Sequence, residues 1–265
     1  MHDSIRRRQC GDLVYYTCDR LPVRHAFTTK RGGVSQGDCE SLNFGFQRGD
    51  KPENVRRNYE ILADTLQIPF GRMTLTQQVH ESRVSVVEES AVGTGLHQPM
   101  DWRSDALVTA LPNTPLAGFY ADCVVTLFCD VKAGVCAVCH AGWRGTAQEI
   151  AAKTVDKMAE LGASRQSIVA VIGPSICCDC FETDADVPQA MYAQMGDRVA
   201  PFIQTRGAKY HVDLQGIQQM TLRYAGLQEE NIINSGLCTK CMSDVFWSHR
   251  ATNGHRGVQA GVICL

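Results

Sequence analysis

Residues 138–146, which read Val-Cys-His-Ala-Gly-Trp-Arg-Gly-Thr, constrain the fold more than any other stretch of this sequence. They begin where an apolar run over 134–138 reads as a buried strand, and they end where a helical pattern starts. The strand delivers His140 to a tight glycine turn, with Arg144 close behind. Because helix starts carry unpaired amides and a positive dipole, we expect this turn to line a functional site. The alternative is a structural turn whose histidine bonds a neighbouring carbonyl.

Apolar periodicity divides the rest of the chain into strands and helices. Residues 124–130 are almost entirely apolar, which predicts a strand buried on both faces, and residues 134–139 are expected to pair with it as a hairpin. Helices are predicted over 52–66 and 145–161, and Asp213 is expected to cap another that reaches Tyr224. Further elements are a helix at 186–195 and strands at 23–29, 74–80, 84–87, 105–109, 116–120, 168–172, 231–233 and 258–265.

No repeat, low-complexity tract or long linker interrupts this succession of elements, so the sequence predicts one mixed α/β domain. We expect residues 1–22 to form a partly flexible N-terminal segment that carries the basic cluster Arg6-Arg7-Arg8. Residues 23–265 are then the single catalytic domain. The length of 265 residues is sufficient for one large core.

Charge and composition exclude several classes of function. The net charge is −2, so no basic field exists to hold nucleic acid, and an anionic ligand needs local arginine or lysine side chains. No apolar run approaches the ~20 residues needed to span a bilayer, and residues 1–4 lack the apolar core of a signal peptide. The thirteen cysteines are odd in number, and several lie in apolar runs. Reduced thiols in a cytoplasmic protein are therefore expected.

Three metal-binding side chains share one situation in the predicted elements. His80 ends a strand, Cys123 precedes one, and His140 ends one. Strand ends that gather at one edge of a sheet converge even when they are far apart in sequence. Two imidazoles and a thiolate suit Zn²⁺, and three protein ligands leave a fourth position open for water or substrate. The alternative is a core cysteine and two hydrogen-bonded histidines.

A rival metal site is suggested by Cys238-x-x-Cys241. Two cysteine pairs can make a structural zinc site, and the second pair would come from Cys177, Cys178 and Cys180. That group is not read as a regular pair, so the sequence leaves this site open.

Eight short motifs follow one another in the chain: His25-Ala-Phe-Thr-Thr-Lys-Arg-Gly-Gly-Val, Ser41-Leu-Asn-Phe-Gly, Gln78-Val-His80, Asp105-Ala-Leu-Val-Thr, Ala121-Asp-Cys123, His140-Ala-Gly-Trp-Arg-Gly-Thr, Ile172-Gly-Pro and Asp213-Leu. By these motifs the chain resembles the YfiH-type family over residues 25–265. The family is known as the laccase-domain or polyphenol oxidase family, and also as a family of purine nucleoside phosphorylases. Its Arg-Arg and Thr-Gly-Arg endings appear here only as His249-Arg250 and Asn253-Gly254-His255-Arg256.

The resemblance implies a fold, a metal and an activity. The implied fold is a layered α/β (α+β) sandwich with mixed sheets, grouped with cysteine-hydrolase-like proteins. The implied zinc ligands are His80, Cys123 and His140, the same three residues that strand ends suggest. Family members are similar in cleaving adenosine, inosine and methylthioadenosine with phosphate and in deaminating adenosine. The expected partners are therefore a small nucleoside and phosphate, without nucleic acid or membrane.

Phosphorolysis needs an anion held beside the anomeric carbon of the sugar. Arg144 and the helix amides after Gly145 are the first candidates to hold phosphate, and Arg31 is the second. Asn43 is a candidate contact for the ribose or the base. Asp122 either orients Cys123 or caps the strand end. Zinc can polarise an oxygen or activate water, and the second role suits deamination.

Three other functions remain open. A copper-dependent polyphenol oxidase matches the older family label, but multicopper centres use His-x-His pairs, and this chain has eight histidines and no such pair. Cu²⁺ can still occupy a site made of imidazole and thiolate. Cys123 as nucleophile and His140 as base would make a cysteine-type amidase acting on cell-wall precursors. A zinc-stabilised scaffold that binds a partner is the non-enzyme alternative.

Overall fold

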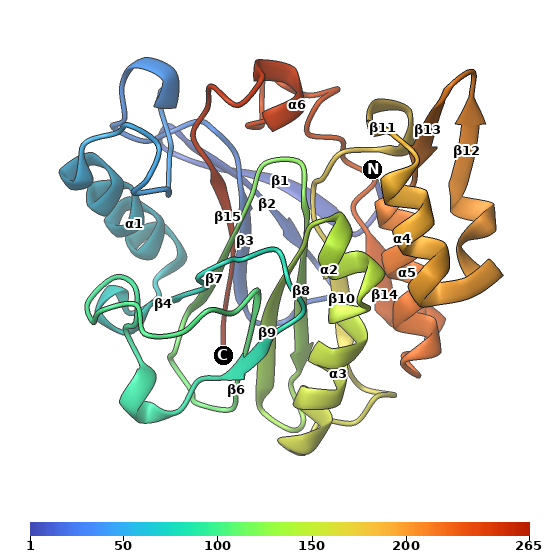
Figure 1. Cartoon of the computed structure of the whole chain (residues 1–265). Coiled ribbons are helices and arrows are strands. Elements are labelled where there is room, and N and C mark those ends of the chain that lie inside the picture. Colours follow the sequence, from blue (N-terminus) through green and yellow to red (C-terminus); the bar gives the residue numbers. More distant parts are fainter.

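The computed structural model describes residues 1–265 as two six-stranded sheets packed face to face, with helices outside each (Figure 1). The first sheet has the order β1 (Ile5–Cys10), β2 (Leu13–Cys18), β3 (Arg24–Thr28), β15 (Gln259–Cys264), β7 (Leu116–Tyr120), β4 (Thr74–Leu75). The second has the order β14 (Ile232–Asn234), β10 (Val169–Ile172), β8 (Val124–Asp130), β9 (Val135–Ala141), β6 (Ala106–Thr109), β5 (Val84–Val86). This is the mixed α/β sandwich that the family resemblance implied.

Helices cover the outer face of each large sheet. The first sheet is covered by α1 (Pro52–Leu66), and the second by α2 (Trp143–Ala147), α3 (Ile150–Glu160), α4 (Asp186–Met195) and α5 (Leu214–Tyr224). A small third sheet, β11 (Glu182–Thr183), β13 (Lys209–Val212) and β12 (Ile203–Arg206), lies beside α4. The short helix α6 (His249–Thr252) precedes β15. No helix has the length and apolar character needed to cross a bilayer.

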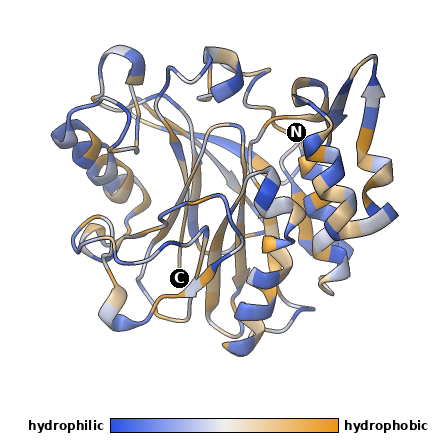
Figure 2. Cartoon of the chain, viewed as in Figure 1, coloured by the Kyte–Doolittle hydropathy of each residue, from blue (hydrophilic) through white to orange (hydrophobic).

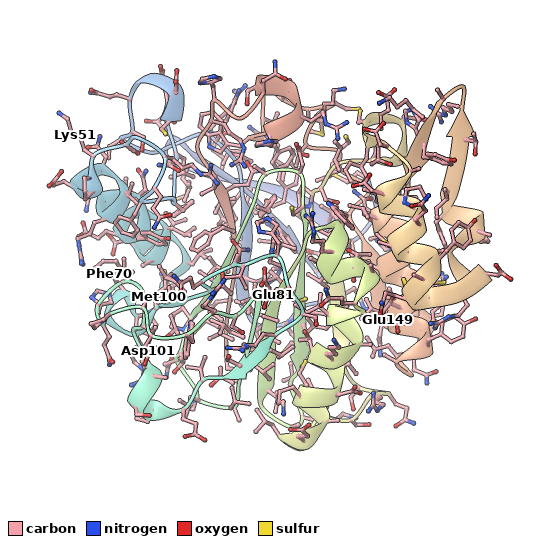
Figure 3. All side chains as sticks on the ribbon, in the orientation of Figure 1. Lys51, Phe70, Glu81, Met100, Asp101 and Glu149 are labelled. Carbon is pink, nitrogen blue, oxygen red and sulfur yellow. The ribbon has the colours of Figure 1, made fainter.

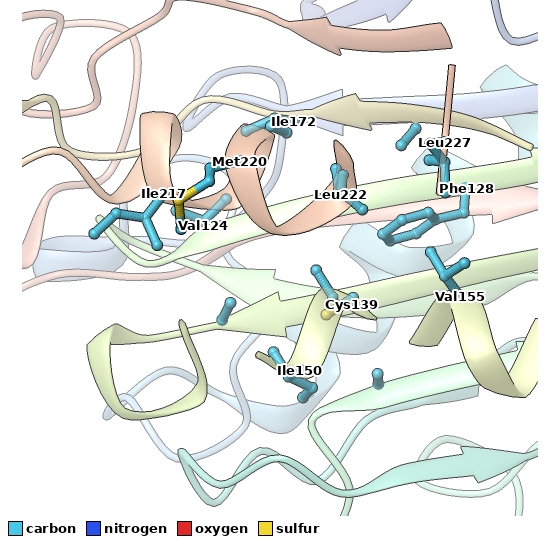
Figure 4. Packing of buried hydrophobic residues seen from close by; sticks show 14 of the residues in the cluster. Val124, Phe128, Cys139, Ile150, Val155, Ile172, Ile217, Met220, Leu222 and Leu227 are labelled. Atoms are coloured by element: carbon cyan, nitrogen blue, oxygen red, sulfur yellow. The ribbon is translucent and has the colours of Figure 1, made fainter. Parts of the chain in front are cut away.

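Strand β8 shows why the two-sheet core forms. Val125 and Leu127 face the first sheet, whereas Val124 and Phe128 face the helices, so both faces are buried as the sequence predicted. Figure 4 shows Val124 and Phe128 gathered with side chains of α3 and α5. Burying each such side chain stabilises the fold by about 1.5–3 kcal/mol. Figure 2 shows the same pattern across the molecule, with hydrophobic residues concentrated on the strands and the inner helix faces.

Two helices begin and end as their sequences predict. Helix α1 has Pro52 in its first turn, where a missing N–H costs nothing, and it buries Val55, Tyr59 and Leu62 against the first sheet. Helix α5 is capped by the Asp213 carboxylate, which accepts a hydrogen bond from the Gly216 N–H at 3.0 Å.

The helix predicted over 145–161 is instead two helices, α2 and α3. Glu149 adopts a left-handed conformation (φ 54°) and breaks the chain direction between them. A Cβ on Gly145 would lie 2.9 Å from the Glu81 carbonyl oxygen, so α2 packs closely against the loop before β5. This tertiary contact, which local periodicity does not encode, accompanies the early end of α2. The predicted apolar stripe of α3, including Ile150 and Met158, is buried.

Two further predictions are corrected by the structure. No strand was predicted over 1–22, but β1 and β2 form a hairpin that pairs with β3 at the edge of the first sheet. Ile5 and Leu13 anchor this hairpin in the core, whereas the arginines of β1 are exposed. The strand predicted over 74–80 ends at Leu75, and His80 lies in a turn with φ 60°.

Candidate functional site

The structure brings His80, Cys123 and His140 together. One ligand atom from each lies within 4.8 Å of the others, and the two imidazoles meet edge to face with ring centroids 5.1 Å apart. Cys123 immediately precedes β8, and His140 is paired with Val125 near the end of β9, so the hairpin places both at one sheet edge. His80 arrives from the loop between β4 and β5. These three residues are called the trio below.

A buried carboxylate, Asp105, holds two members of the trio in place. Its oxygens accept the backbone N–H groups of Val79, His80 and Glu81 at 3.0–3.2 Å. Three bonds to one carboxylate support the left-handed backbone at His80. Asp105 Oδ1 also accepts the Nδ1–H of His140 at 2.9 Å, which leaves the His140 Nε2 free as a metal ligand.

Sequence reasoning did not assign Asp105 to the site. It appeared only as the start of a strand and of the motif Asp105-Ala-Leu-Val-Thr, and β6 begins one residue later. The signal that could have identified it is its charge: a carboxylate next to an apolar strand, fully buried, must find donors for its oxygens.

The trio is electrostatically coupled. Burial alone would raise the pKa of the Cys123 thiol, but the charge of His140 and hydrogen bonds from both histidines outweigh it and lower that pKa to about 6. Burial alone would lower the pKa of His140, but the Cys123 thiolate and Asp105 outweigh it and raise that pKa to about 9. Without metal, the pair is therefore a thiolate and an imidazolium near pH 7, and a metal would replace the proton on His140.

Gly142 leaves space above the trio. A Cβ there would lie 3.1 Å from His80 Cδ2 and 3.4 Å from Cys123 Sγ. The backbone φ of −67° is open to any residue, so only the lost space would be felt. Gly142→Ala is expected to leave the fold intact and to lower kcat/KM for a reaction at the trio by about 10- to 100-fold. The added methyl group would shift a bound substrate, and small misplacements of reacting atoms are costly.

Steady-state kinetics together with a thermal unfolding curve test the Gly142→Ala variant. Gly71→Ala is the matched control, because a Cβ at Gly71 meets nothing within 4 Å. Equal activity of the two variants would show that the space above the trio is not used.

A basic cluster lies within electrostatic reach of Cys123. Arg256 is only 9% exposed and forms no ion pair. Its Nη1 donates to the Gly257 carbonyl at 2.9 Å, and its Nε has no hydrogen-bond partner. Desolvation first, and then the charge of Arg48, lower the pKa of Arg256 to about 10, while Asp122 and Cys123 act in the opposite direction. His249 Nδ1 lies 3.4 Å from Arg256 Nη2. A buried, unpaired guanidinium beside a second arginine is suited to hold an anion.

Asp122 directly precedes Cys123, and its carboxylate holds the chain there through hydrogen bonds to other segments rather than to the thiol. Its carboxylate accepts the Thr239 hydroxyl at 2.6 Å and the Arg250 N–H at 2.7 Å. Its backbone has φ 91°, which these bonds support. Arg250 extends away from this point and donates from Nη1 to the Glu182 carbonyl oxygen at 2.9 Å.

The remaining predicted ligand contacts are dispersed. Arg144 is exposed on α2, and its guanidinium lies 4.1 Å from the centre of the Trp143 ring. Because α2 has only five residues, we do not assign phosphate to its amides. Arg31 lines a different surface pocket together with Asp38, Glu40 and Asp244, whose carboxylates disfavour a phosphate.

Asn43 is a correction. It is fully buried; its Oδ1 accepts the N–H groups of Gly45 and Val258, and its Nδ2 donates to the Gly45 carbonyl and to Asp50. With both amide atoms engaged, it has no free atom for a ribose or a base, and it instead holds its own loop.

The rival site also assembles, as a four-cysteine cluster that could bind a metal: Cys177, Cys180, Cys238 and Cys241. The interpretation of Cys177, Cys178 and Cys180 as an irregular group was wrong. Cys177-x-x-Cys180 has the same spacing as Cys238-x-x-Cys241. Cys178, which obscured this spacing, lies outside the cluster.

Comparison with known proteins gives consistent results. A family model described as multi-copper polyphenol oxidoreductase laccase matches residues 24–265. The purine nucleoside phosphorylase YlmD of Bacillus subtilis (strain 168) is 37% identical over 235 residues, covering 87% of this chain and 84% of that protein. The adenosine deaminase RL5, from an unknown prokaryotic organism, is 35% identical over 231 residues, covering 85% and 87%. The crystal structure of the Bacillus licheniformis hypothetical protein YfiH matches with a TM-score of 0.91 and 31% identity over all of both chains.

Proposed function

The chain belongs to the multi-copper polyphenol oxidoreductase laccase family, and we propose that it is a zinc-dependent purine nucleoside phosphorylase that also deaminates adenosine. Adenosine, inosine and methylthioadenosine, with phosphate, are the proposed substrates. The observation that carries the proposal is the trio itself, with its ligand atoms within 4.8 Å of one another and Asp105 behind it.

The donor set of the trio fits zinc. Two imidazoles and a thiolate of lowered pKa are good ligands, and three protein ligands leave a position for a substrate atom or water. Asp105 orients His140 and fixes the turn that carries His80. When bound, zinc supplies Lewis-acid chemistry.

We assign the phosphate to the basic cluster, with Arg256 as its buried member and Arg48 and His249 at its exposed side. Phosphate held there is within electrostatic reach of Cys123, and we propose that one of its oxygens approaches the anomeric carbon while the bond from that carbon to the purine nitrogen breaks. The purine leaves with the bonding electron pair. Arg144, which is exposed two residues after Gly142, is proposed as a second anion contact.

Arg256→Gln is expected to raise the KM for phosphate by about 10- to 100-fold, because a hydrogen bond to a charged group contributes about 1.5–3 kcal/mol. The metal content should not change. Phosphate-dependence curves for Arg256→Gln and Arg144→Gln distinguish the two arginines, and Arg7→Gln on β1 is the matched control. An unchanged KM for phosphate in Arg256→Gln would show that the basic cluster does not bind phosphate.

Adenosine separates the two proposed activities in one reaction. Phosphorolysis yields adenine and a sugar 1-phosphate and requires phosphate, whereas deamination yields inosine and ammonia and requires only water. We expect both product sets with phosphate and only the second without it. Neither product set from zinc-loaded protein would reject the proposed function.

The amidase alternative is tested by the reactivity of Cys123. In metal-free protein its alkylation by iodoacetamide should be half-maximal near pH 6, because the thiolate persists down to its lowered pKa of about 6 and is protonated below it. Zinc should block the reaction. Labelling is followed by peptide mass spectrometry, with the exposed Cys10 as internal reference. Rapid alkylation of Cys123 in protein that carries zinc would favour the amidase.

A further inference from the structure

We propose that Cys177, Cys180, Cys238 and Cys241 hold a second zinc ion in a closed structural site, distinct from the trio. All four sulfurs lie within 4.8 Å of one another. A tetrahedral zinc with Zn–S bonds of ~2.3 Å requires sulfurs about 3.8 Å apart, which this spacing accommodates. The Sγ atoms of Cys180 and Cys241 are 3.5 Å apart, much farther than the ~2.05 Å of a disulfide.

The sequence spacing supports the same assignment. Each pair is Cys-x-x-Cys, the arrangement in which one short turn directs two sulfurs at one ion. Backbone N–H groups of Cys177 and Cys241 point at Cys238 Sγ from 3.3 and 3.4 Å, and such donors stabilise a thiolate. Four thiolates select zinc or another thiophilic ion rather than a hard cation.

The exposure of these cysteines is hard to explain by packing. Free cysteines usually behave as small apolar side chains and lie in the core. Here Cys241 is exposed, and Cys177 and Cys180 are half-buried, whereas Cys129 and Cys136 on the β8–β9 hairpin are buried as expected. A shared ligand explains why these three exposed or half-buried sulfurs converge on the buried Cys238.

This site would join two segments that support the catalytic centre. The first segment is residues 175–180 and the second is residues 237–241. The Ser175 N–H donates to the Leu237 carbonyl at 3.2 Å, and the Thr239 N–H donates back to Ser175 at 3.1 Å. The first segment also bonds Asp122 through the Ile176 N–H, and the second does so through the Thr239 hydroxyl. Asp122 precedes Cys123 of the trio. With four protein ligands the site has no open position, so its role is to fix these segments.

Metal analysis of purified protein tests the proposal. The wild type should carry about two zinc ions per chain. His80→Ala and the double variant Cys180→Ser/Cys241→Ser should each carry about one, and their combination none. Cys178→Ser is the matched control, since it removes a neighbouring thiol outside the cluster and should retain two. A single zinc in the wild type that disappears with His80→Ala would overturn the proposal.

X-ray absorption at the zinc edge of His80→Ala avoids altering the cluster. The remaining zinc should show four sulfur neighbours at ~2.3 Å. A shell containing nitrogen or oxygen, or a Cys180–Cys241 disulfide found by mass spectrometry without a second metal, would contradict the site. The result does not depend on the proposed activity: failure of phosphorolysis leaves the second zinc intact, and absence of the second zinc leaves the trio intact.

Discussion

Replacing His80 with alanine is expected to remove the metal from the trio and to lower kcat/KM for inosine phosphorolysis by about a thousandfold or more. A metal acting as a Lewis acid contributes several kcal/mol to transition-state stabilisation, and each 1.36 kcal/mol corresponds to about tenfold in rate. The fold should survive, because His80 is exposed and its ring bonds to Cys123 at the trio rather than to the core. The measurement combines metal content, kinetics and a thermal unfolding curve.

His97→Ala is the matched control for this experiment. His97 is also an exposed loop histidine, and its Nε2 bonds only the Phe70 carbonyl. This variant should retain its metal and its activity. Full turnover by metal-free His80→Ala protein would exclude a metal-dependent reaction at the trio.

Asp105→Asn is expected to cause the second large effect, on stability as well as on metal affinity. An asparagine places an N–H₂ group where three backbone donors and the His140 Nδ1–H now meet a carboxylate. Removing one partner of a buried pair costs about 3–5 kcal/mol. Loss of the group that orients a metal-binding histidine lowers metal affinity about 10- to 100-fold. Asp101→Asn, an exposed aspartate on a nearby loop (Figure 3), is the control.

The pH dependence gives Asp105→Asn a signature beyond lost stability. Burial raises the pKa of Asp105, but the His140 hydrogen bond and charge, with bonds from Val79 and Glu81, outweigh it and lower that pKa. Its stabilisation is present above its unfolded pKa of ~3.9 and is lost as the pH falls through the lowered value. The contribution of His140 is full below its unfolded pKa of ~6.5 and is lost as the pH rises through about 9.

In metal-free protein, the difference in unfolding free energy between wild type and Asp105→Asn should therefore be largest between about pH 4 and 6.5 and shrink on both sides. Urea unfolding curves across this range measure it. A difference that does not vary with pH would show that the Asp105–His140 pair is not ionised as we describe.

The parts of the fold that the sequence predicted are those with a local cause. The β8–β9 hairpin follows from two apolar runs, and α1 and α5 follow from helical spacing with Pro52 and Asp213 at their starts. The exposed arginines of β1 carry no such signal, because that strand is defined by pairing with β2. Its place in the sheet is a tertiary effect.

The site was predictable only as far as residue chemistry and strand ends reached. They indicated the trio, but not that His80 lies in a turn fixed by the distant carboxylate of Asp105. Arg256 is buried without an ion pair, within reach of the charges of Arg48 and Cys123, and this environment results from long-range packing. Likewise, Asn43 appeared available in the sequence, and only its four internal hydrogen bonds show that it is not.

The most direct test of a zinc-dependent phosphorylase is the release of hypoxanthine from inosine, with and without phosphate, by protein whose zinc at the trio has been counted. We expect hypoxanthine and a sugar 1-phosphate in equal amounts only when phosphate is present, and loss of both products when the trio is emptied by His80→Ala. Hypoxanthine release without phosphate, or no release from protein with a filled trio, would contradict the proposed function.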